Sequence, residues 1–258
     1  MKKILCLFSA LSIALMTSCS SDDSTEVASE TLLPTKIVET TVENGKSGSL
    51  DYTFTYDGNK LKQISLSDAS KYVYTYTGDV ITKVEEFKSS VLQSTDVYAY
   101  EGGKLASKIT TYAFGSTPPQ KLTFVYNANG TVNANQSEII NKQEIKYDTT
   151  TLYTFANGNI VSSEYINGER EKITSTFDDK KSPFTNITGV KLLLDLDENF
   201  DFYSANNTVK NVTVQTDALG KVVLTATVTT TNKYNANNFL TEVFSGDAKD
   251  SFKLEIAY

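Results

Sequence analysis

A cluster of four acidic residues has the residue types and the close spacing that a metal site would need. They fall within seven positions of one another: Asp195, Asp197, Glu198 and Asp201. Carboxylate oxygens are the hard ligands that Ca²⁺ prefers, so a calcium site is one interpretation of this cluster. The spacing lacks the glycine and the terminal glutamate of an EF-hand loop, and a solvated charged segment is the alternative interpretation.

The absence of histidine limits the enzymes that this chain could be. No histidine occurs in the sequence, which excludes Ser-His-Asp and Cys-His catalysis and every metal site that contains histidine. A glycosidase remains possible, because it needs only two carboxyl groups, one of them held neutral in a cleft. Nothing in the sequence places such a pair. We therefore predict that the protein is not an enzyme and that it uses no cofactor.

Residues 1–18 have the parts of a secretory leader. Lys2 and Lys3 form a short basic region, and a largely apolar run from Ile4 to Met16 follows. A run of this length is too short to cross a bilayer, which needs roughly 20 residues, but it suits the core of a signal peptide. Residues 1–18 are therefore expected to be a removable signal peptide.

A cysteine directly follows this leader. The run Thr17-Ser18-Cys19-Ser20 places a small residue before a lone cysteine, which resembles a bacterial lipoprotein box, although Met16 stands where leucine is more usual. The resemblance implies cleavage before Cys19, lipidation of Cys19 and membrane anchoring. An ordinary secretory signal with an incidental cysteine is the alternative. The other cysteine, Cys6, lies in the leader, so lipidation would account for the single cysteine that remains.

The residues after Cys19 have the composition of a tether. Ser20-Ser21-Asp22-Asp23 resembles the short acidic run that directs Bacteroidetes lipoproteins to the outer face of the outer membrane, and the start of a solvated linker is the alternative. The following residues are rich in Ser, Thr, Asp and Glu, as flexible linkers are. We expect residues 19–31 to be a lipidated flexible tether and residues 32–258 to be a single all-β domain.

The charge of the chain excludes some partners. Removing Lys2 and Lys3 with the leader leaves 22 basic residues against 31 acidic ones, a net charge of −9. Nucleic acid is a poor partner for such a protein, because phosphate contacts need a basic face. The chain also lacks a basic patch for anionic lipid, so the lipid on Cys19 would have to provide the membrane contact.

One motif recurs along residues 51–177. Its first copy is Tyr52-Thr-Phe54-Thr-Tyr56, followed by the turn Asp57-Gly58-Asn59. Alternating aromatic residues indicate a half-buried strand, and Asp-Gly-Asn tolerates the positive φ angles of a tight hairpin. The last aromatic residues of the five copies are Tyr56, Tyr76, Tyr100, Tyr126 and Phe155. Four of them have an aliphatic residue five positions later, namely Leu61, Ile81, Leu105 and Ile160.

This fixed spacing predicts one hairpin geometry that is used repeatedly. A single hairpin is marginally stable in water, but several hairpins laid edge to edge share one aromatic face. We therefore expect consecutive antiparallel hairpins that form a strongly twisted, curled sheet or an open barrel, with at most one short helix.

The rhythm changes in the section from residue 178 to residue 258. Residues 190–200 contain four leucines and few β-branched residues, which predicts a short helix or an irregular crossover there. Asp178-Asp179 before Lys180-Lys181 indicates a turn with internal charge compensation. Strands are expected again around residues 209–215, 222–234 and 252–258.

The many aromatic residues allow two interpretations. The chain has 15 tyrosines, 13 phenylalanines and no tryptophan. Such residues could form a stacking surface for sugar rings, or they could simply be the packed face of the sheet. The alternation along the strands is already explained by packing, so the packed face is the favoured interpretation.

These motifs resemble two known families. The sequence of residues 54–61 resembles the YD (RHS-type) repeat, although Thr77 and Glu101 replace its aspartate in later copies. The later section resembles Bacteroidetes lipoproteins of a DUF4595-like family, with Phe177 where that family usually has tyrosine. The residues that carry this second resemblance are Phe177-Asp-Asp-Lys-Lys-Ser-Pro-Phe184, Ser204-Ala-Asn-Asn207 and Lys233-Tyr234-Asn-Ala-Asn237. The resemblance covers roughly residues 51–258 and implies the fold and an envelope location, without an assigned activity.

The sequence as a whole predicts an outer-membrane-anchored lipoprotein, exposed on the cell surface or facing the periplasm. We expect it to act as a non-catalytic binding or interaction module, with a glycan or a protein as the ligand. A purely structural envelope role is the first alternative, and a carbohydrate-active enzyme is the second.

The Cys19→Ala substitution tests the anchor. We expect the wild-type protein in a Bacteroidetes host to fractionate with membranes and the variant to be soluble, because no other feature of the sequence provides an anchor. Blots of membrane and soluble fractions measure this, and protease treatment of intact cells reports the membrane face. Recovery of both proteins in the soluble fraction would contradict the lipoprotein prediction.

Overall fold

The computed structural model of the protein describes residues 31–194 and 200–258, which form 17 strands and one 3₁₀ turn. The first strands are β1 (Lys36–Glu43), β2 (Lys46–Asp57), β3 (Lys60–Leu66), β4 (Ser70–Thr77), β5 (Val80–Lys88), β6 (Val91–Glu101), β7 (Lys104–Tyr112), β8 (Gln120–Tyr126) and β9 (Val132–Ile140). The others are β10 (Gln143–Ala156), β11 (Asn159–Asn167), β12 (Glu169–Phe177), β13 (Thr208–Thr216), β14 (Val222–Thr229), β15 (Thr231–Tyr234), β16 (Leu240–Gly246) and β17 (Ser251–Ala257), and the 3₁₀ turn is η1 (Val190–Leu192).

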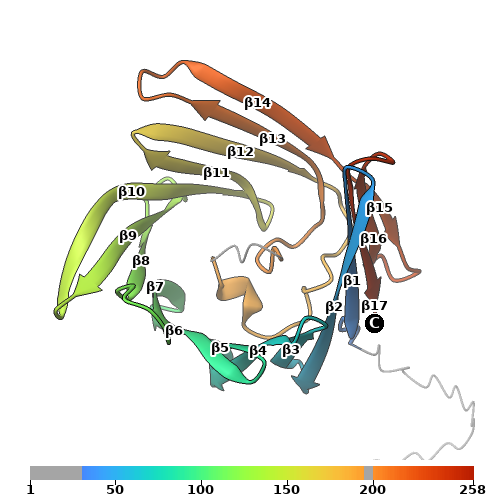
Figure 1. Cartoon of the computed structure of the whole chain (residues 1–258), viewed down its shortest axis with the longest axis horizontal. Coiled ribbons are helices and arrows are strands. Elements are labelled where there is room, and N and C mark those ends of the chain that lie inside the picture. The colour runs from blue at the N-terminus through green and yellow to red at the C-terminus, as the bar shows by residue number, and fades with distance from the viewer. Residues whose placement is uncertain (1–30, 195–199) are drawn as a thin grey trace, which may run out of the picture. The chain divides into compact units, whose positions relative to one another are not determined.

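The strands form one nearly closed, barrel-like sheet (Figure 1). From β1 to β14, each strand pairs antiparallel with the next one along the chain. A second run joins β15, β16 and β17, and β17 then pairs with β1, so that Ile37 lies opposite Ile256. Among the described strands, no ladder joins β14 to the second run. The prediction of an all-β curled sheet of antiparallel hairpins is confirmed.

The repeated hairpins share one geometry. In β2–β3, β4–β5 and β6–β7, the register shifts directly before the last aromatic residue of the first strand. The shift pairs this residue with the aliphatic residue five positions later, as in Tyr76 opposite Ile81. Gly58 and Gly78 have φ angles of 56° and 57°, as the two-residue turns require. Each shift is a β-bulge, which bends the strand and increases its twist, and the repeated bulges therefore curl the sheet.

At three points of the sheet, a tyrosine ties one hairpin to the hairpin before it. Tyr100 donates its hydroxyl to the carbonyl oxygen of Ile81 at 2.7 Å, and Tyr126 donates to that of Leu105 at 3.0 Å. Tyr258 does the same to Leu240 at 2.7 Å. In each case the tyrosine is near the end of one hairpin strand, and the carbonyl belongs to the aliphatic residue after the preceding hairpin's turn. We refer to these contacts as the tyrosine bonds.

Alternating aromatic residues of β2, β4 and β6 point into the interior of the sheet. Tyr52, Phe54, Tyr74 and Tyr98 are all buried. The interpretation of the alternating aromatic residues as the packed face of the sheet is therefore correct for these positions.

The interior of the curled sheet is filled by the chain between β12 and β13. We call the described parts of residues 178–207 the interior loop, and Figure 1 shows it with η1 inside the ring of strands. Phe200 packs its ring 5.0 Å from that of Tyr52, and Phe184 lies 6.3 Å from Phe54, both distances between ring centroids. Val190 has no exposed surface. The core is thus made of the sheet's aromatic face and the apolar side chains of this loop.

The expected short helix or crossover at residues 190–200 is a crossover that contains a single 3₁₀ turn, η1. Residues 195–199 lie outside the described part of the chain. Within the described residues, no helix has the length and apolar character that a membrane span requires.

The tyrosines of the sheet predict a loss of stability at high pH. Burial raises the pKa of Tyr76 and of Tyr100 from the ordinary 10 to about 12, and it raises the pKa of Tyr56 and Tyr258 as well. A raised pKa in the folded state means that the neutral hydroxyl favours folding. This contribution is fully present below pH 10 and is lost as the pH rises from 10 to 12.

Urea denaturation at a series of pH values, with phenolate absorbance followed in parallel, measures this effect. The free energy of unfolding should be flat up to about pH 9 and should fall above about pH 10. Tyr100→Phe removes one of the groups and should make the alkaline fall less steep. A free energy of unfolding that stays constant to pH 12 would contradict the expectation.

Gly189 lies where the interior loop meets the sheet, and we predict that a larger residue at this position destabilises the protein. Its φ angle is +82°, and an added Cβ would lie 2.7 Å from the carbonyl oxygen of Asp79. Gly220 has the same φ angle of +82°, but an added Cβ there would meet nothing within 4 Å. Both substitutions to alanine carry the left-handed penalty of about 1–2 kcal/mol, and Gly189→Ala adds an overpacking cost of about 1–3 kcal/mol.

Chemical denaturation of the two variants compares their free energies of unfolding. Gly189→Ala should be the less stable of the two, and Gly220→Ala is the matched control for backbone strain alone. An equal loss of unfolding free energy in both variants would mean that the interior loop can move away from Asp79 without a loss of stability.

Candidate functional site

A polar cluster fixes both ends of the interior loop. Oδ1 of Asp178 accepts hydrogen bonds from the backbone N–H of Lys180 at 2.9 Å and of Asn207 at 3.2 Å. Its Oδ2 accepts a short hydrogen bond from the hydroxyl of Tyr234 and a longer one, at 3.4 Å, from the side-chain amide of Asn232. Residues near 178, 207 and 234 are thus held together by one carboxylate. These are the three stretches that carry the resemblance to the DUF4595-like family.

A second set of contacts ties the same loop to the hairpin β10–β11. The side chains of Asn159 and Asn206 are joined at 3.0 Å, and Asn206 also donates its backbone N–H to Oδ1 of Asn159 at 3.0 Å. Ser204 accepts from the backbone N–H of Ile160 at 3.3 Å. Asn159 and Ser204 are buried. A buried polar group without a partner is costly, so these contacts fix where the loop sits.

The interpretation of Asp178–Lys181 as a charge-compensated turn is correct only in part. Asp179 and Lys180 form an ion pair at 3.1 Å. Asp178 instead accepts hydrogen bonds from the loop and from β15, because its carboxylate is the acceptor that the converging N–H groups need. The hydrogen bond to Asp178 and, above all, burial raise the pKa of Tyr234 to about 12.

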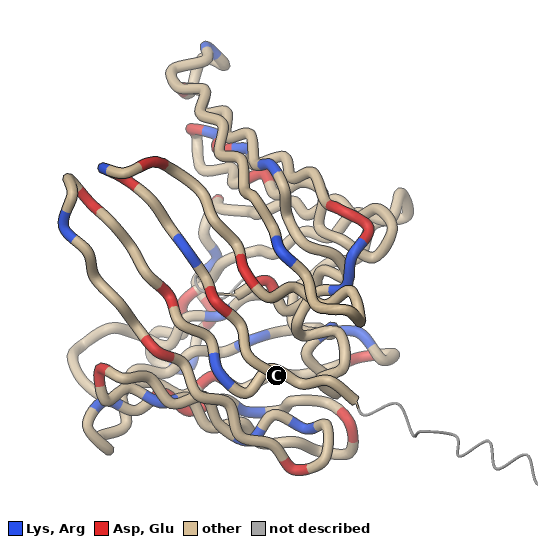
Figure 2. The backbone as a smooth tube through the Cα atoms, turned by 90° about the vertical axis from the view of Figure 1, so that its right-hand side faces the viewer, with Lys and Arg blue, Asp and Glu red and all other residues tan. Residues whose placement is uncertain are grey.

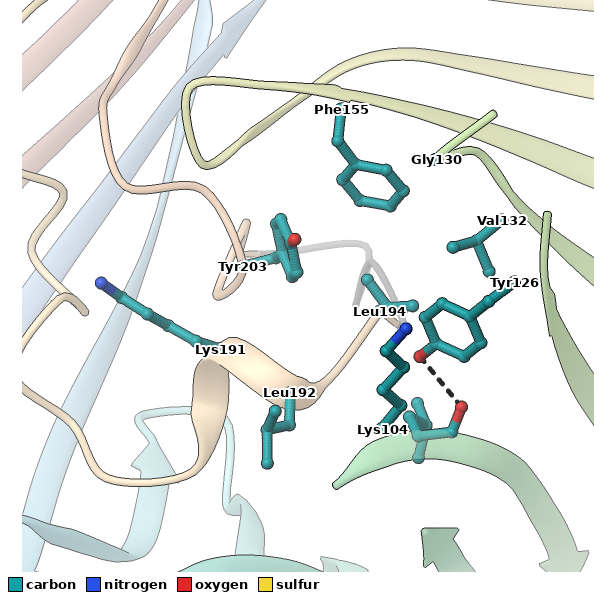
Figure 3. A pocket seen from close by; sticks show the side chains of 10 residues that line it. Lys104, Tyr126, Gly130, Val132, Phe155, Lys191, Leu192, Leu194 and Tyr203 are labelled. Atoms are coloured by element: carbon teal, nitrogen blue, oxygen red, sulfur yellow. Dashed lines mark hydrogen bonds between the residues drawn. The ribbon is translucent and has the colours of Figure 1, made fainter. Parts of the chain in front are cut away.

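The interior loop and the sheet enclose a pocket of about 320 Å³. Figure 3 shows side chains from β7 to β10 on one side and from the loop on the other. The lining residues are Lys104, Leu105, Tyr126, Gly130, Val132, Phe155, Lys191, Leu192, Leu194 and Tyr203. A concave, mostly apolar site with a few polar groups is the usual form of a small-molecule site. We call it the loop–sheet pocket.

Aromatic rings and two lysines, Lys104 and Lys191, give this pocket its chemistry. The rings of Phe155 and Tyr203 lie 5.2 Å apart, and the Lys104 Nζ lies 4.7 Å from the centre of the Tyr126 ring. Tyr126 is held in place by its hydrogen bond to the carbonyl of Leu105, drawn as a dashed line in Figure 3. Burial and, to a smaller extent, Asp201 raise the pKa of Tyr203, so its hydroxyl is neutral at ordinary pH.

Lys104 occupies a repeated position but differs in its partners. Lys60 follows the turn of an earlier hairpin in the same way, and its Nζ lies 5.8 Å from the ring of Tyr76. Lys60 also pairs with Asp79 at 3.1 Å. No carboxylate of the described residues lies within ion-pair distance of Lys104. Among the described residues, therefore, no carboxylate neutralises its charge, which faces the loop–sheet pocket.

The structure describes only one of the predicted calcium ligands. Asp195, Asp197 and Glu198 lie outside the described residues. Asp201 accepts from the backbone N–H of Tyr203 at 3.1 Å and of Ser204 at 2.9 Å, which closes a turn of the interior loop. Within the described residues, no group of three or more Asp, Glu, His or Cys side chains is placed to hold a metal ion. The predicted lipidation site, Cys19, also lies outside the described residues.

Sequence reasoning missed the residues of the loop–sheet pocket. Lys104 and Tyr126 look like ordinary repeat positions, and Lys191 and Tyr203 belong to a segment without strand periodicity. One signal could have pointed to them. The apolar residues Phe184, Phe200 and Phe202 follow no strand pattern, and apolar side chains of this size need burial against another element.

The fold has a counterpart among solved structures. A comparison with protein-family models found no match, and neither did a comparison with curated protein sequences. The chain is similar to the crystal structure of a porin-like protein from Bacteroides uniformis, with a TM-score of 0.51 and 10% sequence identity, over 87% of this chain and 96% of that chain. At this identity the similarity shows the shared all-β fold alone. Membership of the YD-repeat and DUF4595-like families stays a prediction.

Proposed function

We propose that the protein is a lipid-anchored outer-membrane protein whose barrel-like sheet serves as a non-catalytic binding module. Its site is the loop–sheet pocket, and its ligand is a small molecule with a sugar-like ring and an anionic group. The observation that supports this most directly is the pairing of Lys104, which has no described carboxylate partner, with the rings of Tyr126, Phe155 and Tyr203.

The charge of the site favours an anionic group on the ligand. The chain is acidic, with a net charge of −7, yet the described lining of the loop–sheet pocket contains two lysines and no carboxylate. Hydrogen bonds to charged groups stabilise a complex by roughly 1.5–3 kcal/mol. Lys104 can give such a bond to a carboxylate, whereas the equivalent Lys60 is already paired with Asp79.

The rest of the lining favours a ring with hydroxyl groups. The faces of Tyr126, Phe155 and Tyr203 offer apolar contact to the C–H side of a sugar ring. No described residue accepts a hydrogen bond from the hydroxyl of Tyr203, so this group can bind a sugar hydroxyl. An acidic sugar, such as a uronate, combines both features.

The chemistry of the lining favours binding over hydrolysis. A glycosidase needs two carboxyl groups beside the scissile bond. The ten lining residues in the described part of the chain carry none, and the chain has no histidine to act as a base. A purely structural envelope role is the second candidate, and the polar cluster around Asp178 favours it, because that cluster rigidifies the interior without using the pocket.

Calorimetry with acidic and neutral sugars tests the proposal. We expect saturable binding of a uronate, and Lys104→Ala should weaken it about tenfold, because one charge-assisted hydrogen bond is lost. Lys60→Ala is the matched control, since it removes a lysine at the same repeat position away from the loop–sheet pocket. Neutral sugars should bind weakly and should not respond to either change.

Two results would count against the binding module. If no sugar acid binds, the structural role is favoured. If Lys60→Ala and Lys104→Ala weaken binding equally, the site lies outside the loop–sheet pocket.

A further inference from the structure

Strand β14 differs from every other strand in composition and exposure. Its sequence, Val-Val-Leu-Thr-Ala-Thr-Val-Thr, contains no charged residue, whereas each of the other described strands contains at least one. All eight of its residues are exposed. Val222, Val223 and Val228 have exposed fractions of 54%, 61% and 50%. An apolar strand that is exposed on both faces is a candidate for an interface.

The outer edge of β14 has free backbone groups. Among the described strands, β14 pairs in a ladder with β13 alone. Thr230 donates its backbone N–H to the carbonyl of Val209 at 3.0 Å. This bond shows which alternate residues of β14 direct their backbone groups toward β13. In an antiparallel pair, alternate residues direct both backbone groups to the neighbouring strand. The backbone groups of Val223, Thr225 and Thr227 therefore point away from β13.

Protected edges of natural sheets carry charges, prolines or bulges that prevent further pairing. Residues 222–229 contain no charge and no proline. The register shift in the β13–β14 ladder lies near the start of β14, where Gln215 pairs with Leu224 and Thr216 pairs with Val222, and the register is regular from Leu224 to Thr229. The central part of the edge is thus regular and open to another strand.

We propose that β14 pairs antiparallel with β14 of a second copy of the chain, about a two-fold axis at Thr225. The inference does not depend on the loop–sheet pocket or on the lipid anchor. A two-fold axis normal to the sheet keeps each side chain on its own face, so residues of the same parity meet. Leu224 then lies opposite Ala226 on a single apolar face. This is the self-complementary pattern of a symmetric dimer.

The backbone supports the same register. Thr225 meets its own symmetry mate, and Val223 meets Thr227. These are the residues whose N–H and C=O groups point to the free edge, so the pairing satisfies them. Centring the axis on Ala226 would draw Thr230 into the pair. The N–H and the hydroxyl of Thr230 are already bonded to Val209 and Thr208, the latter at 2.8 Å.

Charge favours a second copy as the partner. Two copies of a chain with a net charge of −7 repel each other, and charged positions are spread over the strands of the sheet (Figure 2). Strand β14 is the one described strand along which two copies can meet without opposing charges.

Light scattering and sedimentation of the chain carrying Cys6→Ala and Cys19→Ala test the proposal. We expect a dimer that dissociates on dilution. Thr225→Lys places two ammonium groups face to face and should shift the protein to monomer. Thr111→Lys, at an exposed threonine of β7, is the matched control and should leave the dimer unchanged. Circular dichroism checks that both variants fold.

A cysteine at position 225 provides a test that does not depend on disruption. In the same background, Thr225→Cys should form a disulfide-linked dimer under mild oxidation, because the two residues meet at the axis, whereas Thr111→Cys should not. A wild-type chain that is monomeric at all concentrations overturns the proposal. So does a dimer that persists with Thr225→Lys and fails to cross-link through Thr225→Cys.

Discussion

A hydrogen bond from a tyrosine hydroxyl to a backbone carbonyl of the preceding hairpin links neighbouring hairpins at three points of the fold. A bulge interrupts the regular ladder in the hairpins β4–β5 and β6–β7, and the carbonyl next to it would otherwise lie close to the core without a full set of partners. The phenol provides the partner and its ring fills the space beside it. Ile81 and Leu105 show both halves of this arrangement, with buried side chains and with carbonyls bonded to Tyr100 and Tyr126.

The curl that the bulges produce creates a second constraint, because a curled sheet with an aromatic inner face needs something inside it. The interior loop meets this need with Phe184, Phe200 and Phe202, whose rings contact one another at 4.8–5.8 Å. A loop inside a sheet carries backbone groups that water cannot reach, so its ends need fixed polar partners. Asp178 supplies them at one point. The loop–sheet pocket lies beside β7–β10, where the loop does not fill the interior completely.

Much of the sheet could be predicted from the sequence because its signals are local. The alternation in residues 52–56 and the turn at Gly58 are set by neighbours a few positions away, and the five-residue spacing from Tyr76 to Ile81 encodes the bulge. The interior loop could not be predicted in the same way. Its side chains find partners that are distant in the sequence, as in the hydrogen bond from Asn186 to the carbonyl of Leu32, 154 positions away.

The candidate site could not be predicted from local sequence either. Lys104 follows a hairpin turn just as Lys60 does, and local sequence cannot say that one of them has an aspartate partner and that the other faces a pocket. The convergence of Asp178, Asn207 and Tyr234 is also invisible to any periodic pattern, although the motifs that contain them are recognisable one by one.

The pairing of β1 with β17 has a consequence for the order of folding. Most ladders of the sheet join strands that are neighbours along the chain, so they can form early and at little cost in loop entropy. The ladder between Ile37 and Ile256 joins residues near the two ends of the domain, and it closes the largest possible loop. It is therefore expected to form late, after the hairpins. Until it forms, β1 and β17 are open edges, and a nascent chain would be most prone to aggregation during that interval.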